Sequence, residues 1–259
     1  MNILITGASS GIGFDLCKRL VKKGEHVIVT VHTKKEVNIT VEKLKELHIN
    51  NVEVIKLDIT KEKDRNLINN YDIDVLVNTS AIGVSGSLLN LEVSEIRKNF
   101  ETNFFSTLEL IKTYIKNRGN KPSKVVITSS LAGYMPIPFW GSYTSSKIAL
   151  TMFIKCLNRE LKMTNLNVKL KLILPGAYYT GFNEYIIETK EKLNNTIFKG
   201  TIEKEIRRER HLFRLIEKKR LNSVINTYDR AIYSKNNRLK YKVPFTQWLL
   251  SKIYLLLLM

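Results

Sequence analysis

Cysteine, histidine and proline are all scarce in this chain of 259 residues. The two cysteines, Cys17 and Cys156, are too few for a disulfide scaffold or a cysteine-rich zinc site. The four histidines lack the HExxH and HxxxH spacings, so we expect no metal catalysis. Five prolines and 12 glycines exclude collagen-like and low-complexity chains, and 44% hydrophobic residues exclude wholesale disorder. A globular protein of one large domain or two small ones remains.

Long apolar runs are absent as well. No stretch reaches the roughly 18 apolar residues of a membrane-spanning helix. The chain passes from Met1 directly into a short apolar run and a glycine turn at Gly7, which does not match a signal peptide. We therefore expect a cytoplasmic protein.

Acidic residues are in deficit, with 24 Asp and Glu against 42 Lys and Arg. The basic excess is denser in the last third, where residues 181–259 carry 17 Lys and Arg against 8 Asp and Glu. Such an excess is found in proteins that bind nucleic acids or anionic lipids. No helix-turn-helix, zinc-finger or aromatic RNA-binding signature accompanies it, so we expect no nucleic-acid partner.

Continuous runs of Val, Ile and Leu alternate with helical patterns along the chain, which is typical of a parallel sheet covered on both faces. We predict a Rossmann-type, doubly wound, three-layer α/β/α fold. It forms a single domain over residues 1–244, with a helical substrate lid at about 181–215 and an apolar C-terminal helix or tail at 245–259. The expected strands are residues 3–5, 26–31, 52–57, 75–77, 125–127, 168–174 and 238–243. The expected helices are residues 12–21, 41–47, 91–116, 143–161 and 201–220.

A glycine-rich loop, Thr-Gly-Ala-Ser-Ser-Gly-Ile-Gly, follows the first strand at residues 6–13. Gly7 permits a tight turn, Gly11 lets the backbone approach a pyrophosphate, and Gly13 lets the next helix pack closely. The N-terminus of that helix directs free N–H groups and a positive dipole end at the phosphates. Between a strand and a helix, this pattern predicts a dinucleotide site.

The end of the second strand bears on cofactor choice. NAD-binding proteins usually place an acid there for the ribose hydroxyls. Here Val31 is followed by His32, Thr33, Lys34 and Lys35, with no carboxylate in that run. The cations suit a 2′-phosphate, so we favour NADP(H), and NAD(H) stays open.

Tyr143 and Lys147 lie four residues apart at the start of a predicted helix and so share one face. A nearby ammonium lowers the pKa of a phenol by stabilising its anion, which makes the phenol a usable acid and base. Ser130, at a strand end thirteen residues before Tyr143, is placed to hydrogen-bond a substrate carbonyl.

Together these motifs make the sequence resemble the short-chain dehydrogenase/reductase family over residues 1 to about 180. The resemblance implies a catalytic tetrad of Asn103, Ser130, Tyr143 and Lys147. It also implies a set of cofactor-binding residues: Gly7, Ser9, Ser10, Gly11, Ile12, Gly13, His32, Asp58, Ile59, Asn78, Tyr143, Lys147, Pro175, Gly176 and Thr180. One departure is visible, because the family's Asn-Asn-Ala-Gly after the fourth strand is here Asn78-Thr79-Ser80-Ala81.

The resemblance also implies a mechanism, in which NADPH delivers hydride to a carbonyl carbon and Tyr143 donates the proton. Ser130 positions the carbonyl, Lys147 lowers the pKa of the tyrosine and holds the nicotinamide ribose, and Asn103 supports a water that connects Lys147 to solvent. The reverse direction oxidises an alcohol. A protein that keeps the fold as an NAD(P)-binding sensor or scaffold is the alternative.

Substrate and partners are harder to predict. Aromatic and apolar residues near the expected pocket mouth favour a bulky or apolar substrate, although ordinary lid packing explains them equally well: Met135, Phe139, Trp140, Tyr178, Tyr179, Phe182 and Tyr185. We expect a homodimer or homotetramer joined through the two long helices. Ten of the twelve residues 248–259 are apolar, which fits either peripheral membrane contact or packing on protein.

Overall fold

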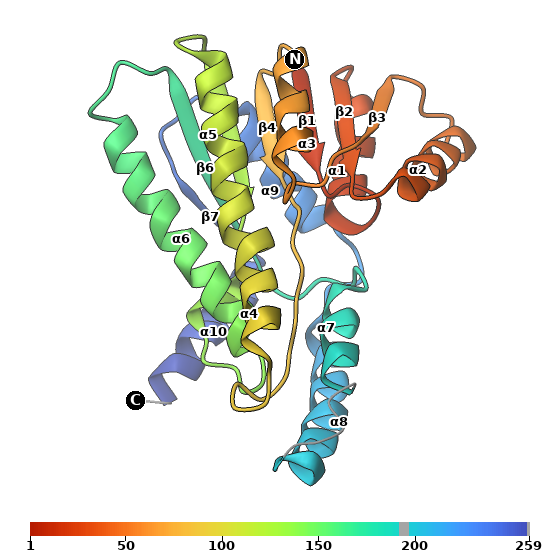
Figure 1. Cartoon of the computed structure of the whole chain (residues 1–259), viewed down its shortest axis with the longest axis vertical. Coiled ribbons are helices and arrows are strands. Elements are labelled where there is room, and N and C mark those ends of the chain that lie inside the picture. The colour runs from red at the N-terminus through yellow and green to blue at the C-terminus, as the bar shows by residue number, and fades with distance from the viewer. Residues whose placement is uncertain (192–196, 258–259) are drawn as a thin grey trace.

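The computed structural model describes residues 1–191 and 197–257, and these contain one seven-stranded parallel sheet (Figure 1). The strand order is β3-β2-β1-β4-β5-β6-β7, so the predicted doubly wound Rossmann-type fold is confirmed. The strands are β1 (Asn2–Thr6), β2 (His26–Val31), β3 (Val52–Lys56), β4 (Val75–Asn78), β5 (Ser123–Thr128), β6 (Val168–Pro175) and β7 (Lys240–Val243).

Helices cover both faces of the sheet. Helices α1, α2 and α9 pack on one face, and α5 and α6 pack on the other. The α-helices are α1 (Gly11–Val21), α2 (Lys34–Glu46), α3 (Glu62–Arg65), α4 (Val93–Phe100), α5 (Ser106–Arg118), α6 (Gly141–Leu161), α7 (Phe182–Glu191), α8 (Lys199–Ile216), α9 (Asn222–Tyr233) and α10 (Phe245–Leu257).

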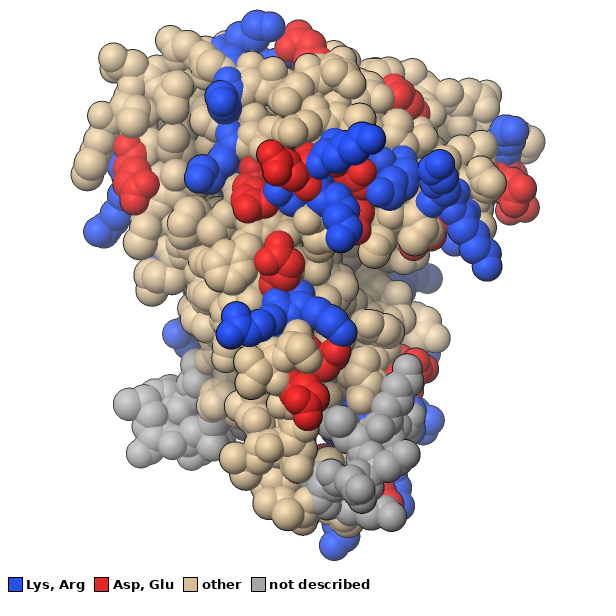
Figure 2. All heavy atoms as spheres, in the orientation of Figure 1, with Lys and Arg blue, Asp and Glu red and all other residues tan. Residues whose placement is uncertain are grey.

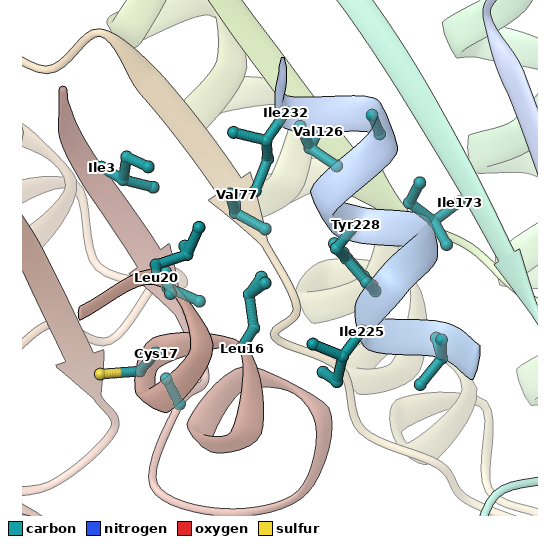
Figure 3. Packing of buried hydrophobic residues seen from close by; sticks show 14 of the residues in the cluster. Ile3, Leu16, Cys17, Leu20, Val77, Val126, Ile173, Ile225, Tyr228 and Ile232 are labelled. Atoms are coloured by element: carbon teal, nitrogen blue, oxygen red, sulfur yellow. The ribbon is translucent and has the colours of Figure 1, made fainter. Parts of the chain in front are cut away.

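Alternation along the strands divides the core into two layers, because successive side chains of a strand point to opposite faces. In β1, Ile3 and Ile5 join the core under α1 and α9, whereas Leu4 joins the core under α5 and α6. Figure 3 shows Leu16 of α1 and Tyr228 of α9 meeting in the first of these layers. Burial of both layers fixes the register of the strands and therefore the positions of their carboxyl ends.

Two of the expected helices differ most from the structure, and α3 and α9 were not expected at all. Helix α2 begins at Lys34 rather than at residue 41, because Thr33 and Glu36 form a capping box that starts it early. The long helix expected over residues 91–116 is α4 and α5 joined by a π-helical turn, Glu101–Phe105. Such turns are frequent at functional sites.

The α7–α8 hairpin and α10 extend beyond the carboxyl ends of the strands (Figure 1). No helix in the described ranges is both long and apolar enough to cross a membrane. On the face in view in Figure 2, Lys and Arg are interspersed with Asp and Glu and do not form one continuous basic surface. This face therefore lacks the basic stripe that a nucleic-acid-binding surface would present.

Candidate active site

A cavity of about 990 Å³ opens at the carboxyl ends of the strands. Among the sequence-predicted site residues, two lie outside its lining, Asn78 and Asn103. The others line it: Gly7, Ser9, Ser10, Gly11, Ile12, Gly13, His32, Asp58, Ile59, Ser130, Tyr143, Lys147, Pro175, Gly176 and Thr180. Within the described ranges no group of three or more His, Cys, Asp or Glu side chains is arranged to hold a metal ion.

The glycine loop forms one wall of this cavity. Gly7 has a φ of +64°, and a Cβ there would lie 2.8 Å from the Cα of Ser80. A Cβ on Gly13 would lie 2.9 Å from the carbonyl oxygen of Gly7, so only glycine lets α1 start this close to β1. Ser10, the N-cap of α1, makes no side-chain cap hydrogen bond. The first N–H groups of α1 are therefore left available at the cavity wall.

Ser130, Tyr143 and Lys147 meet on the opposite wall, and all three are buried. Ser130 lies two residues after the end of β5. Its Oγ accepts a hydrogen bond from the Ala132 N–H at 3.1 Å. One turn separates Tyr143 from Lys147 on α6, and the Lys147 Nζ lies 5.8 Å from the centre of the phenol ring. The three groups predicted to handle the proton thus converge at one place.

Burial is the largest cause of the pKa shifts of Tyr143 and Lys147. It raises the pKa of Tyr143 to about 12, and a hydrogen bond with Ser130 offsets part of the rise. It lowers the pKa of Lys147 to about 8, because the buried ammonium loses its hydration. The predicted lowering of the tyrosine pKa by Lys147 is outweighed here by burial. Tyr143 consequently keeps its proton throughout the neutral range.

Asn103 lies behind the cavity, in the π-helical turn. Its amide oxygen accepts from the Ile82 N–H at 2.9 Å, and its amide nitrogen donates to the Ile82 carbonyl at 2.9 Å and to Ser146 Oγ at 3.0 Å. Both amide hydrogens are thereby used, so the side chain ties the loop after β4 to α6. The role predicted for Asn103 in supporting a water stays a prediction.

Asn78 also lies beneath the cavity. Its amide nitrogen donates to Thr107 Oγ1 at 2.9 Å, and its oxygen accepts from the hydroxyl of Thr6. The side chain therefore joins the ends of β1 and β4 to α5. This position explains why the departure from the family pattern after Asn78 leaves the strand ends in place.

The end of the cavity next to β2 holds an acid that the sequence analysis missed. Glu36 lines the cavity, although no carboxylate was expected near the end of β2. Its Oε2 accepts from the Thr33 N–H at 2.8 Å, and its Oε1 lies 3.4 Å from Ser9 Oγ. The Thr-x-x-Glu spacing of a capping box was the signal that could have placed it. Asp58 lies nearby, bound to Thr60 and 3.5 Å from His32 Nε2.

Aromatic side chains enclose the part of the cavity next to Tyr143. The rings of Trp140 and Phe182 lie 6.1 and 5.6 Å from the Tyr143 ring, and Phe213 of α8 lies 5.6 Å from Trp140. Of the residues predicted at the pocket mouth, two are outside the lining, Phe139 and Tyr179, and the rest line it, namely Met135, Trp140, Tyr178, Phe182 and Tyr185. The surface next to the phenol is therefore largely apolar.

Gln247 of α10 is a second lining residue that the sequence analysis missed. Its Oε1 accepts from the Ala177 N–H at 2.6 Å, and its Nε2 donates to the Ile216 carbonyl at 2.7 Å. It thereby joins the segment after β6 to the end of α8. A Cβ on Gly176 would lie 2.0 Å from the same Oε1, so this contact requires glycine at residue 176.

A buried ion pair holds the α7–α8 hairpin against Trp140. Lys190 is fully buried and donates to Glu209 Oε1 at 2.7 Å, and the Trp140 Nε1–H donates to the same oxygen at 3.1 Å. Burial lowers the pKa of Lys190, and the Glu209 carboxylate partly reverses that effect. The pair thus couples the hairpin to the wall that surrounds Tyr143.

Glu209→Gln is expected to loosen the hairpin, because it leaves the Lys190 ammonium buried without a counter-charge, a change that typically costs roughly 3 kcal/mol or more. Limited proteolysis should then cleave within residues 182–216 about tenfold faster than in the wild type. Glu188→Gln is the matched control, since Glu188 is an exposed acid of the same hairpin. Equal cleavage rates for all three proteins would contradict the assignment.

Known proteins that are similar to this chain are short-chain dehydrogenases and reductases. The family model for short chain dehydrogenases matches residues 1–191. The probable short-chain type dehydrogenase/reductase VdlC of Helicobacter pylori is 30% identical over 200 residues, which cover 73% of this chain and 69% of that protein. The 3-ketodihydrosphingosine reductase of Bacteroides thetaiotaomicron is 28% identical over 183 residues, 70% of this chain and 65% of that protein. The chain thus spans about two thirds of the length of these relatives.

Among solved structures, a short chain dehydrogenase/reductase from Burkholderia phymatum in complex with NAD superposes with a TM-score of 0.80. It is 19% identical, and the match covers 97% of this chain and 91% of that one. The likeness extends over β7 and α10, beyond the segment that the family model matches.

Proposed function

This chain belongs to the short-chain dehydrogenase family, and from that premise we propose that it is an NADP(H)-dependent oxidoreductase that interconverts a carbonyl compound and a secondary alcohol. One observation carries the proposal: Ser130, Tyr143 and Lys147 converge in the cavity that the glycine loop also lines. A site that only binds a nucleotide has no need for a buried phenol beside a buried amine. Sequence relatives that are reductases or dehydrogenases support the same class of reaction.

The cavity fits a nicotinamide dinucleotide. The glycine loop has no room for added Cβ atoms at Gly7 and Gly13, and the N–H groups at the start of α1 have no side-chain cap, as a pyrophosphate cradle requires. Residues 7–13 would hold the pyrophosphate, Asp58 and Ile59 the adenine, and Lys147 with residues 175–180 the nicotinamide side. When bound in its reduced form, the dinucleotide supplies the hydride for the carbonyl carbon.

The chain's own residues handle the proton and the carbonyl oxygen. Tyr143 holds a proton at neutral pH and donates it from its Oη to the oxygen as negative charge develops there. Ser130, within hydrogen-bonding reach of Tyr143, would turn its one hydroxyl proton to that oxygen and so fix the substrate against the phenol. A protonated Lys147 stabilises the phenolate left after the transfer. In the direction of oxidation, the phenolate takes the proton from the alcohol.

The walls around Tyr143 support an apolar, bulky substrate. Trp140, Phe182 and Phe213 enclose the phenol, and Ile137 and Leu212 extend the apolar lining away from it. Burial of apolar substrate surface provides binding energy in such a pocket. The similarity to a reductase of 3-ketodihydrosphingosine, a ketone on a long hydrocarbon chain, supports the same substrate class.

The preference for NADP(H) rests on the residues after β2. His32, Thr33 and two lysines of the first turn of α2 follow the strand. Two acids line the cavity here as well: Glu36, whose Oε2 is bound to the cap of its own helix, and Asp58, whose Oδ1 is bound to Thr60. His32 lines the cavity, and the two lysines beside it supply positive charge next to the lining, which we take to favour a 2′-phosphate over a free hydroxyl.

His32→Asp tests this preference, because it adds a carboxylate where a 2′-phosphate would lie. The variant should lose NADPH affinity by roughly tenfold or more while NADH binding is kept or improved. Titration of cofactor fluorescence measures both dissociation constants. His48→Asp, beyond the far end of α2, is the control for the charge change. If the wild type binds NADH more tightly than NADPH, the preference is wrong.

A carbonyl panel tests the function itself. The purified protein is mixed with NADPH and then with ketones of increasing length, from 2-butanone to methyl 3-oxododecanoate, and the reduced nicotinamide absorbance is followed. We expect turnover that is faster for the long ketones. Cofactor binding without turnover of any ketone would instead favour a nucleotide-binding sensor or scaffold.

A further inference from the structure

Helix α10 presents an apolar face to solvent. Phe245, Leu249, Leu250 and Ile253 are between 46% and 65% exposed, which is unusual for side chains of this size on one short helix. The opposite side of the helix is anchored, because Gln247 binds the Ala177 and Ile216 backbone. The four exposed residues, named here the α10 face, are thus held outward by a fixed helix.

The sequence segment that contains the α10 face is basic and has no acid. Residues 231–259 contain five Lys and Arg and no Asp or Glu. Burial lowers the pKa of Lys242, and the charges of Lys240, Lys252 and Arg238 lower it further. The Lys242 ammonium lies 3.9 Å from the centre of the Trp248 ring, at the start of α10. An apolar face bordered by cations matches an anionic lipid surface.

The cavity meets the surface in the same region. Leu250 of α10, Leu212 of α8 and Tyr185 of α7 each line the cavity and are each 46–57% exposed. These side chains therefore lie at its mouth, and Glu205 and Arg208 of α8 line the same cavity. Helix α10 and the α7–α8 hairpin lie toward the same end of the molecule (Figure 1).

We propose that the α10 face docks on an anionic lipid bilayer, so that the cavity mouth opens at the lipid surface and takes up an apolar carbonyl substrate from it. The docking is argued from the surface residues alone, whereas the uptake of substrate rests on the proposed function. With 13 residues, α10 is about 20 Å long and lies along the surface instead of crossing it.

A second copy of the chain suits this face less well. A two-fold contact would bring the α10 face of one copy against that of another and set Lys242 and Lys252 near their own equivalents. No acid in residues 231–259 would neutralise them. Lipid phosphates supply that charge directly.

Vesicle sedimentation tests the docking without any turnover. The full chain should sediment with phosphatidylcholine vesicles that contain phosphatidylglycerol and at least tenfold less with phosphatidylcholine alone. A variant with Phe245→Ser, Leu249→Ser and Ile253→Ser should lose at least tenfold in binding. So should a variant with Lys242→Glu and Lys252→Glu.

Two matched controls separate docking from general stickiness. Ile39→Ser, Leu47→Ser and Met163→Ser remove exposed apolar side chains elsewhere. The pair Lys45→Glu and Lys116→Glu makes the same change in net charge away from α10. Both controls should bind vesicles like the wild type. Equal losses in the control and α10 variants would overturn the proposal.

Gel filtration distinguishes the remaining outcomes. In one outcome, the wild type sediments with neither vesicle type while the triple serine variant of α10 loses an oligomeric state that the wild type has. In that case the face is an interface between copies and the proposal fails. If sedimentation behaves as expected but no ketone is reduced, docking stands and the proposed function fails. With turnover, the apolar variant should slow reduction of vesicle-embedded methyl 3-oxododecanoate and leave the rate with 2-butanone unchanged.

Discussion

Replacement of Tyr143 by Phe is expected to abolish carbonyl reduction while cofactor binding is preserved. The phenol Oη is the proton donor in the proposed reaction, and loss of a general acid typically costs 10²–10⁴-fold in rate, so we expect a fall in kcat of about 10³-fold. The ring of Phe keeps the contacts with Trp140 and Phe182, which leaves the walls of the cavity in place. The rate is measured with methyl 3-oxododecanoate, and NADPH affinity is measured by fluorescence.

Tyr178→Phe is the control for removing a hydroxyl from the same cavity. Tyr178 also lines it, but its hydroxyl is bound to Ser223 Oγ at 2.8 Å. This variant should keep kcat within a few-fold of the wild type. A Tyr143→Phe protein that turns over within tenfold of the wild type would remove the phenol from the mechanism.

The Lys147→Met variant is expected to lose activity and to become more stable than the wild type. The ammonium is needed to stabilise the phenolate and to hold the nicotinamide side, so kcat/KM should fall by about 10³-fold. Lys147 is only 1% exposed, and its Nζ donates one bond, to the Thr128 carbonyl at 3.3 Å. Methionine is of similar length and needs no hydration. The unfolding free energy should therefore rise even as turnover is lost.

The stability advantage of Lys147→Met over the wild type should become smaller as the pH rises. Burial lowers the pKa of Lys147 from 10.5 to about 8, which corresponds to roughly 3 kcal/mol of destabilisation when the group is charged. Below pH 8 both the folded and the unfolded chain carry the proton, so the full cost applies. Between pH 8 and 10.5 only the unfolded chain binds the proton, and the stability of the wild type rises with pH. Lys147→Met lacks this rise.

Thermal unfolding at pH 7 and pH 9.5 measures the difference between wild type and Lys147→Met. The variant should melt several degrees higher at pH 7, with a smaller advantage at pH 9.5. Lys171→Met is the control for a buried lysine with a structural role, because the Lys171 Nζ donates to the Asn236 and Arg238 carbonyls. It should lower the melting temperature. A lower melting temperature for Lys147→Met would show that burial of this ammonium costs nothing.

The sheet and the catalytic groups were predictable from the sequence because each depends on local pattern. Apolar runs placed the strands, and in a doubly wound sheet the residues after each strand meet at one edge. Gly7 and Ser130 follow β1 and β5, and Tyr143 and Lys147 share a helix face, so their convergence required no knowledge of the packing. The resemblance to a known family then assigned their roles.

The features that were missed depend on contacts between distant segments. Glu36 reaches the cavity because its capping box starts α2 seven residues early, and Gln247 reaches it from α10, seventy residues after Ala177 in the chain. Lys190 and Glu209 look like ordinary charges of polar helices until the hairpin folds them against Trp140. The hydrogen bonds between the Asn103 side chain and the Ile82 backbone likewise join segments that lie far apart in the sequence.

The central claim is that this cavity transfers hydrogen from a reduced dinucleotide to a carbonyl carbon while Tyr143 supplies the proton. Reaction of the wild type with methyl 3-oxododecanoate and NADPH carrying deuterium at the transferable position, followed by mass spectrometry of the product, tests it most directly. The account predicts an alcohol one mass unit heavier, with the label on the former carbonyl carbon, and about 10³-fold less of it from Tyr143→Phe in the same time. An alcohol without the label, or equal labelled product from Tyr143→Phe, would contradict it.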